Sequence, residues 1–167
     1  LALGLEIPFG GPQVVRAADG SPEVNAWVVI RPDDTVVIRV ARSVMGQGTI
    51  TGLAQMVAEE LECDWSKVTY EYPTPGESLK RKRVWDSFST GGSRGIRMSH
   101  DYVRMGGATA PEMLVAAAAA QWDVPASQCR AANSVITHGP PGRKTTYGKV
   151  GELAARREPP KDVKLKD

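Results

Sequence analysis

The chain has 167 residues, a length that suits one ordinary domain. Hydrophobic residues make up 41% and charged residues 24%, so the composition fits a globular protein and excludes global disorder. The formal net charge of +2 is too small to indicate a nucleic-acid partner unless the charge is concentrated. The basic run Lys80-Arg81-Lys82-Arg83 is the one concentration. Such runs are usually solvated, and a minority of them bind a partner subunit or an anion.

Cysteine usage and hydropathy narrow the class further. Cys63 and Cys129 lack the paired spacing of a zinc or iron–sulfur site, so we expect no metal bound through cysteines of this chain. A disulfide and two buried thiols both remain open, and burial is favoured for Cys63 on an apolar helix face. No apolar run approaches the roughly 20 residues that span a bilayer. The apolar start, Leu1–Phe9, fits the remainder of a removed export signal or an arbitrary chain boundary.

The pattern of turn residues and apolar residues predicts the elements in chain order. Residues 1–22, rich in Gly and Pro, predict an irregular arm. The β-branched runs Trp27–Ile30 and Thr35–Val40 flank the turn Arg31–Asp34 and predict a β-hairpin. Further segments follow from helical spacing, proline and glycine positions. They are a helix at 49–62, a strand at 68–72, a long loop at 73–92, a helix from 93 to about 122, a hairpin of 131–137 and 144–147, a short helix at 149–156 and a linker-like tail at 158–167.

Two features inside the long predicted helix affect its shape. Gly106-Gly107 indicates a close-packing point or a kink. Pro111 predicts a kink or two separate helices, because an interior proline removes a hydrogen bond and clashes with the preceding turn. The elements together predict an α+β fold in which a mixed β-sheet with hairpins is covered by two main helices. The domain itself is expected to span residues 23–157.

The turn Met45-Gly46-Gln47-Gly48 is the first candidate site. Its glycines permit positive φ and close backbone approach, and the following helix offers unpaired N–H groups and its positive dipole end. Gln47 can donate and accept hydrogen bonds, which suits a heterocycle or an oxo group better than bare phosphate. An ordinary strand-to-helix corner explains the same residues. Because Thr51 stands where a third glycine is needed, the turn is not a dinucleotide fingerprint.

The second candidate site is Ser89–Gly95, which again places hydroxyls and glycines at a helix start. Arg94 could grip an oxyanion with two hydrogen bonds. A capped helix with Arg94 in a surface ion pair is the alternative. No nucleophile, base or metal cluster stands out: His100 and His138 are isolated, and the pair Glu59-Glu60 suits a solvated helix face.

The stretch Arg42–Thr51, followed by Gln55–Leu61, resembles the molybdenum-binding subunits of the xanthine dehydrogenase/aldehyde oxidase family. The resemblance is closest to the exported branch, which includes isoquinoline 1-oxidoreductase-like and periplasmic aldehyde dehydrogenases, and it covers nearly all of residues 23–167. Relatives often carry an acidic residue where this chain has Val44. The resemblance implies that both turns hold a molybdopterin dinucleotide, usually the cytosine form. The implied cofactor-binding residues are Gly46, Gln47, Gly48, Gly91, Gly92, Ser93 and Arg94.

The same resemblance implies the setting of this chain. The family hydroxylates aldehydes or N-heterocycles with water as oxygen source, and its catalytic glutamate lies in another part of the subunit. We therefore expect no catalytic residue here and no activity from this chain alone. Expected partners are the remainder of the molybdenum subunit, a subunit with two [2Fe–2S] clusters and, in some relatives, a c-type cytochrome with haem c. The expected location is the periplasm. The alternative is a non-catalytic interaction module whose glycine turns are structural and whose Lys80–Arg83 run binds another protein.

Overall fold

The computed structural model describes residues 14–139 and 142–167. Two three-stranded sheets and two principal helices form the fold, together with three shorter helices. The strands are β1 (Val28–Ile30), β2 (Val36–Arg39), β3 (Val68–Glu71), β4 (Cys129–Ala132), β5 (Val135–His138) and β6 (Lys144–Thr146). The helices are α1 (Thr49–Leu61), α2 (Pro75–Lys80), α3 (Arg94–Arg97), α4 (His100–Trp122) and α5 (Tyr147–Ala154), and single 3-10 turns lie at Trp65–Lys67 and Ala126–Gln128.

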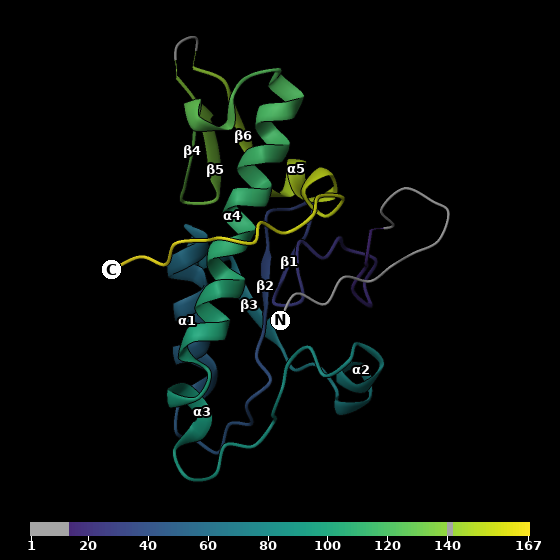
Figure 1. Ribbon diagram of the computed structural model, residues 1–167, viewed down its shortest axis with the longest axis vertical. Coiled ribbons are helices and arrows are strands. Elements are labelled where there is room, and N and C mark those ends of the chain that lie inside the picture. The colour runs from purple at the N-terminus through teal and green to yellow at the C-terminus, as the bar shows by residue number, and fades with distance from the viewer. Residues whose placement is uncertain (1–13, 140–141) are drawn as a thin grey trace.

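Helix α4 runs along the long axis of the molecule. In Figure 1, α1 and the sheet β1-β2-β3 lie beside its N-terminal half, and the sheet β4-β5-β6 with α5 lies at its C-terminal end. The segments leading into α1 and α3 both reach the opposite, lower end of the picture. This arrangement confirms the predicted α+β class.

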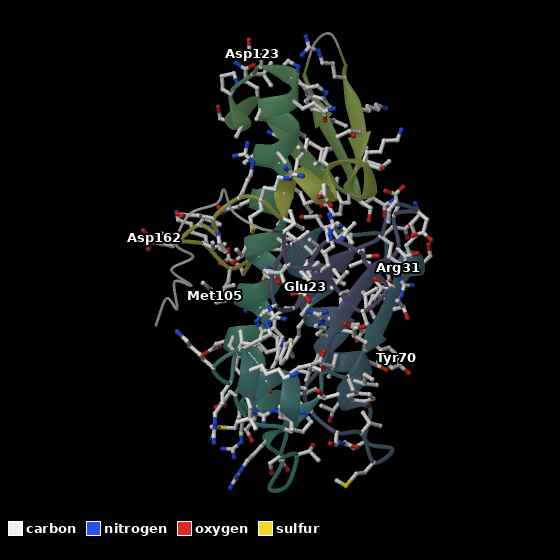
Figure 2. The ribbon with its side chains drawn as sticks, turned by 90° about the vertical axis from the view of Figure 1, so that its right-hand side faces the viewer. Glu23, Arg31, Tyr70, Met105, Asp123 and Asp162 are labelled. Atoms are coloured by element: carbon white, nitrogen blue, oxygen red, sulfur yellow. The ribbon has the colours of Figure 1, made fainter. Side chains whose placement is uncertain are left out.

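The first sheet is mixed, as predicted. Strands β1 and β2 pair antiparallel, with Val28 opposite Ile38, and β3 pairs parallel to β2. Every residue of β1 and β2 is buried, so both faces of these strands are covered and their β-branched side chains fill the core. Helix α1 supplies the crossover that a parallel β2–β3 pair requires. Tyr70 projects outward from the edge strand β3 (Figure 2).

The two glycines of α4 are close-packing points. A Cβ atom on Gly107 would lie 2.7 Å from the carbonyl oxygen of Val57, so α1 and α4 approach each other to a distance that only glycine permits. A Cβ atom on Gly106 would lie 2.4 Å from the Trp27 ring. The glycine pair thus fixes how α4 lies against both α1 and the first sheet.

Four predicted elements differ in detail. The predicted loop 73–92 contains α2, which begins with a capping box: the Thr74 hydroxyl accepts from the backbone N–H of Glu77, and the Glu77 carboxylate accepts from the backbone N–H of Thr74. The predicted helix 93–122 is broken at Met98–Ser99 instead of at Pro111, which lies inside a continuous α4.

The predicted strand 131–137 is two strands. Asn133 and Ser134 adopt positive φ of 50° and 62° and form the tight turn between β4 and β5. The predicted final helix begins at Tyr147 instead of Lys149, directly after β6, and ends at Ala154.

Both ends of the described chain contact the body. The arm prediction for residues 1–22 falls mostly outside the described residues; within them, Arg16 pairs with Glu152 at 2.7 Å. The tail 158–167 crosses α4 (Figure 1), and the ammonium group of Lys166 lies 2.6 Å from the carboxylate of Glu62.

The prediction that Glu59 and Glu60 both lie on a solvated helix face is wrong for Glu60. Glu59 is exposed, but Glu60 is 3% exposed and its carboxylate lies 2.6 Å from the guanidinium of Arg104 on α4. The helical phase alone placed both carboxylates outward; α4 covers Glu60 and supplies the cation that a buried carboxylate needs.

The cysteines are both free thiols in the structure. Cys129 is buried and Cys63 half-buried, immediately beyond the end of α1. Burial raises the pKa of the Cys63 thiol to about 12. Within residues 14–139 and 142–167, no group of three or more His, Cys, Asp or Glu side chains could hold a metal ion. No helix of that part of the chain is long and apolar enough to cross a membrane.

Candidate functional site

The first turn lies between β2 and α1 and has the backbone its glycines predict. Gly46 and Gly48 adopt φ of 90° and 77°, and the space where a Cβ would stand on either is open. Gly48 is the N-cap of α1, and no side chain among residues 14–139 and 142–167 caps the N–H groups of the first turn. The helix start therefore presents backbone donors that are available to an external acceptor.

The Gln47 side chain holds this turn in shape. Its amide oxygen accepts from the backbone N–H of Met45, and its amide nitrogen donates to the carbonyl of Ser43 at 3.1 Å. The same nitrogen donates to the hydroxyl of Thr90 at 3.2 Å. Gln47 is exposed, so it connects the two turns at the surface.

The second turn precedes α3. Gly92 and Ser93 adopt φ of 65° and 56°, and Ser93 is the N-cap of α3 without a side-chain cap hydrogen bond. A Cβ on Gly91 would meet nothing within 4 Å. Gly91, Gly92, Ser93 and Arg94 are all exposed, and no ion pair is recorded for Arg94 among the described residues.

The structure brings the two turns together by helix packing. A Cβ on Gly95 would lie 2.9 Å from the side chain of Thr49 and 3.3 Å from the hydroxyl of Thr90. A Cβ on Gly52 would lie 2.8 Å from Ile96. Because α1 and α3 touch at small residues close to their starts, the turn that precedes each helix opens at the same end of the molecule. The two turns that carry the seven predicted binding residues therefore lie next to each other.

Sequence reasoning missed Arg42, which lies behind this site. Its side chain is fully buried, with 2% exposure. The Nε atom donates to the hydroxyl of Ser99 at 2.8 Å, and an η nitrogen donates to the carbonyl of Ser89 at 2.6 Å. Arg42, three residues beyond the end of β2, is thus tied to the segment that carries the second turn. The available signal was an arginine just beyond the β-branched run Thr35–Val40 and close to the glycine turn.

Within the two segments that form the turns, the charged side chains are all cations. Residues 42–49 and 87–99 include Arg42, Arg94 and Arg97 and contain no aspartate or glutamate. The first turn of α1 also lacks an acidic residue, so the positive end of its dipole has no carboxylate in the first turn to oppose it. Open glycine backbone, uncapped N–H groups and unopposed cations together suit a bound anion such as a pyrophosphate.

The other residues considered from the sequence lie apart from this site. The ring of His138 contacts Gln128 and lies 6.2 Å from that of Trp122, and His100 contacts Asp101. In the basic run, Arg81 covers the buried Trp85 ring at 4.9 Å and pairs with Glu23.

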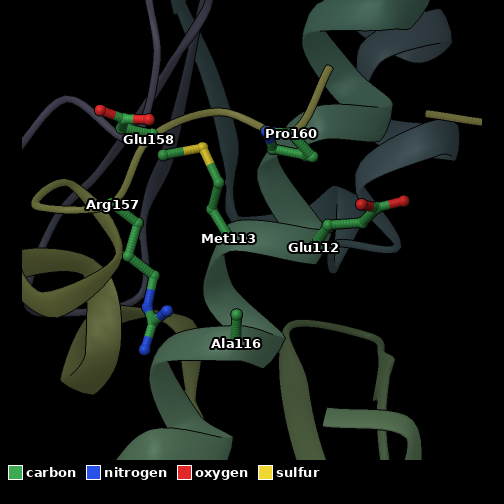
Figure 3. A pocket seen from close by; sticks show the side chains of 6 residues that line it. All are labelled: Glu112, Met113, Ala116, Arg157, Glu158 and Pro160. Atoms are coloured by element: carbon green, nitrogen blue, oxygen red, sulfur yellow. The ribbon is translucent and has the colours of Figure 1, made fainter. Parts of the chain in front are cut away.

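Two surface pockets lie along α4, and neither includes a residue of the two turns. One, of about 280 Å³, lies between α4 and the segment after α5 (Figure 3). Its lining residues are Glu112, Met113, Ala116, Arg157, Glu158 and Pro160. The other, of about 550 Å³, is an open groove where α1 approaches the start of α4, and Cys63, Trp65 and His100 help to line it. The candidate site is an exposed platform, not a closed pocket.

Comparison with known families gives the chain its class. The sequence model of the molybdopterin cofactor-binding domain matches residues 4–165, which is nearly the entire chain. The chain belongs to this family, and the resemblance found in the sequence is confirmed.

Individual relatives agree with the family. The chain is 31% identical over 132 residues to the membrane-bound aldehyde dehydrogenase [pyrroloquinoline-quinone] of Gluconacetobacter polyoxogenes, covering 79% of this chain and 16% of the relative. It is 33% identical over 139 residues to the isoquinoline 1-oxidoreductase subunit beta of Brevundimonas diminuta, covering 80% of this chain and 18% of the relative. The chain spans less than a fifth of the length of either relative.

A solved structure shares the fold. Quinoline 2-oxidoreductase from Pseudomonas putida 86 superposes with a TM-score of 0.56 over 83% of this chain and 17% of that one. The sequence identity is 19%, so this likeness concerns the fold alone.

Proposed function

We propose that this chain holds the molybdopterin cofactor of a molybdenum hydroxylase that oxidises aldehydes or N-heterocycles with water as oxygen source. The observation that carries the proposal is the joining of two glycine turns into one acid-free, cation-bearing platform within a molybdopterin cofactor-binding domain. The names of the two relatives support the reaction class, since one is an aldehyde dehydrogenase and the other an isoquinoline oxidoreductase.

The residues of the platform have distinct parts in this proposal. Gly46 and Gly48 let the cofactor approach the backbone, and the N–H groups at the start of α1 donate to its phosphate oxygens. Arg94 pairs with the same anion from the second turn. Gln47 holds the two turns together through its hydrogen bonds to Ser43 and Thr90. When bound, the cofactor supplies the molybdenum centre at which the substrate is oxidised.

Several finer assignments belong to the proposal. The dinucleotide is the cytosine form, the enzyme is exported to the periplasm, and its partners carry [2Fe–2S] clusters and haem c. The remainder of the molybdenum subunit encloses the exposed platform and contributes the catalytic glutamate. These assignments are supported by the sequence resemblance of the Arg42–Leu61 stretch to the exported branch of the family.

Metal and cofactor analysis of the purified native enzyme tests the proposal. We expect molybdenum together with a released pterin and a cytosine nucleotide. A bound quinone without molybdenum, or a chain isolated with no cofactor and no partner, would overturn it.

A matched glycine pair locates the cofactor at the first turn. Gly48 and Gly142 have nearly equal φ, 77° and 79°, and open space where a Cβ would stand. Alanine should therefore strain both backbones equally, by about 1–2 kcal/mol. We expect Gly48→Ala to lower the molybdenum content at least tenfold and Gly142→Ala to leave it unchanged. Equal content in the two variants would remove the first turn from the site.

A further inference from the structure

The buried guanidinium of Arg42 has hydrogen bonds but no carboxylate partner. It donates to the hydroxyl of Ser99 and the carbonyl of Ser89, both neutral acceptors. The Ser99 hydroxyl, itself completely buried, also accepts from the hydroxyl of Tyr102 at 2.6 Å. Among the ion pairs of the described residues, none includes Arg42.

The other well-buried arginine of this region is neutralised within the chain. Arg39, three residues earlier and 5% exposed, pairs with Glu23 and Glu71. Removing a cation from water is unfavourable unless an opposite charge compensates for it. Arg39 meets this condition inside the fold, whereas Arg42 does not. Compensation of the Arg42 charge therefore requires a negative charge from outside the described residues.

The place of Arg42 indicates where that charge lies. Its partner Ser89 begins the segment that carries Thr90, Gly91 and Gly92, and Thr90 in turn accepts from Gln47 of the first turn. No acidic residue occurs in residues 42–49 or 87–99. An anion bound at the two turns would supply a negative charge beside both segments.

We infer that Arg42 is a positioning residue whose buried charge is balanced by the anionic group of the bound cofactor. The inference rests on the proposed function and deepens it: Arg42 holds the second turn in place through Ser89 and couples cofactor binding to the stability of the fold. In the cofactor-free protein this charge has no ion-pair partner within residues 14–139 and 142–167. In the loaded protein the anion compensates for it.

This coupling predicts a signature that a purely structural residue lacks. The native assembly is compared with the same assembly prepared from cells that cannot make molybdopterin, and Tm is measured for both. In Arg42→Met we expect the Tm gain on cofactor loading to fall by more than half and the molybdenum content to fall at least tenfold. In Arg42→Lys, which keeps the charge, we expect most of the Tm gain and of the molybdenum to return.

Arg39→Met is the matched control, because it removes an equally buried but internally paired arginine. It should lower Tm by the same amount with and without cofactor. If Arg42→Met does the same and keeps its molybdenum, the inference is wrong. The inference also fails if Arg42→Lys loses as much molybdenum as Arg42→Met.

A second measurement covers the case in which Arg42→Met does not fold. The cofactor-free wild-type and Arg42→Lys assemblies are titrated with inorganic pyrophosphate. We expect Tm to rise in both, with a weaker response after Ser99→Ala, which removes an acceptor that holds Arg42. No response in the wild type would overturn the inference. A wild-type enzyme without molybdenum would instead reject the proposed function.

Discussion

At the scale of single residues, the polar groups that matter most are buried ones with specific partners. Tyr147 is fully buried, and its hydroxyl donates to the carbonyl of Leu61 at 2.7 Å. This bond satisfies a carbonyl in the last turn of α1, which has no N–H partner within its own helix. Tyr147 thereby joins the start of α5 to the end of α1.

Replacing Tyr147 by phenylalanine should therefore destabilise the protein by about 1–2 kcal/mol, the cost of a buried hydrogen bond with one partner left unsatisfied. Tyr70→Phe is the control, because Tyr70 is half exposed on the edge strand; its effect should stay within about 0.5 kcal/mol. Urea denaturation measures both. Equal effects of the two substitutions would contradict the assignment.

Thiol chemistry at Cys63 gives a prediction about pH. Burial raises the pKa of this thiol to about 12 from an ordinary value of 9.0. At pH 8 the native thiol should react with iodoacetamide about a thousandfold more slowly than a free cysteine, because the thiolate is the reacting form. Alkylation followed by mass spectrometry measures the rate. A rate close to that of the denatured protein would show that the thiol is not protected.

The same shift has a consequence for stability. The folded protein keeps the proton longer than the unfolded chain, so the contribution of Cys63 is fully present below about pH 9 and is lost as the pH rises toward 12. The free energy of unfolding should therefore fall over this range. Replacing Cys63 by alanine should reduce that slope.

At the scale of elements, the crossing of α1 and α4 depends on a glycine. Alanine normally favours a helix interior over glycine by about 1 kcal/mol. At Gly107 the added methyl group would lie 2.7 Å from the carbonyl oxygen of Val57, and backbone atoms cannot move aside cheaply. Gly107→Ala should therefore destabilise the protein by about 2 kcal/mol despite the better helix propensity.

Gly151 in α5 provides the matched control. A Cβ there would meet its nearest atoms at 3.6 Å or more, an ordinary contact. Gly151→Ala should be neutral or stabilising by up to about 1 kcal/mol. Thermal unfolding of both variants tests the opposite signs, and a stabilising Gly107→Ala would show that the helices do not approach this closely.

The elements that sequence reasoning predicted well are those whose signals are local. The hairpin of β1 and β2 follows from two β-branched runs around Arg31–Asp34, and α1 follows from its apolar spacing. Helix α2 was missed because two prolines and a glycine in 73–76 favour a loop, although Thr74 and Glu77 form a capping box. The turn at Asn133–Ser134 was missed, although Asn and Ser favour turns, because the single predicted strand 131–137 runs through both residues.

At the scale of the whole molecule, the site itself marks the limit of sequence reasoning. The glycines of each turn indicate backbone freedom, which is a local property. That the turns meet depends on contacts across the fold, such as Thr49 against Gly95 and Gln47 with Thr90. The role of Arg42 depends on knowing that it is buried and that Ser89 and Ser99 lie within its reach. These facts require the packed structure.

The tail 158–167 is a further case in which composition and structure differ, because its composition predicts a linker. In the structure, the Lys166 ammonium group contacts Glu59 and Glu62, and the Arg104 side chain donates to the Lys166 carbonyl. Lys166→Ala removes a cation from two nearby carboxylates, those of Glu59 and Glu62, and should cost up to about 1 kcal/mol. It should also accelerate hydrogen exchange throughout 158–167. Lys164→Ala, at an exposed position in the same segment, should change neither quantity, so equal exchange in the two variants would mean that the tail is a linker in solution.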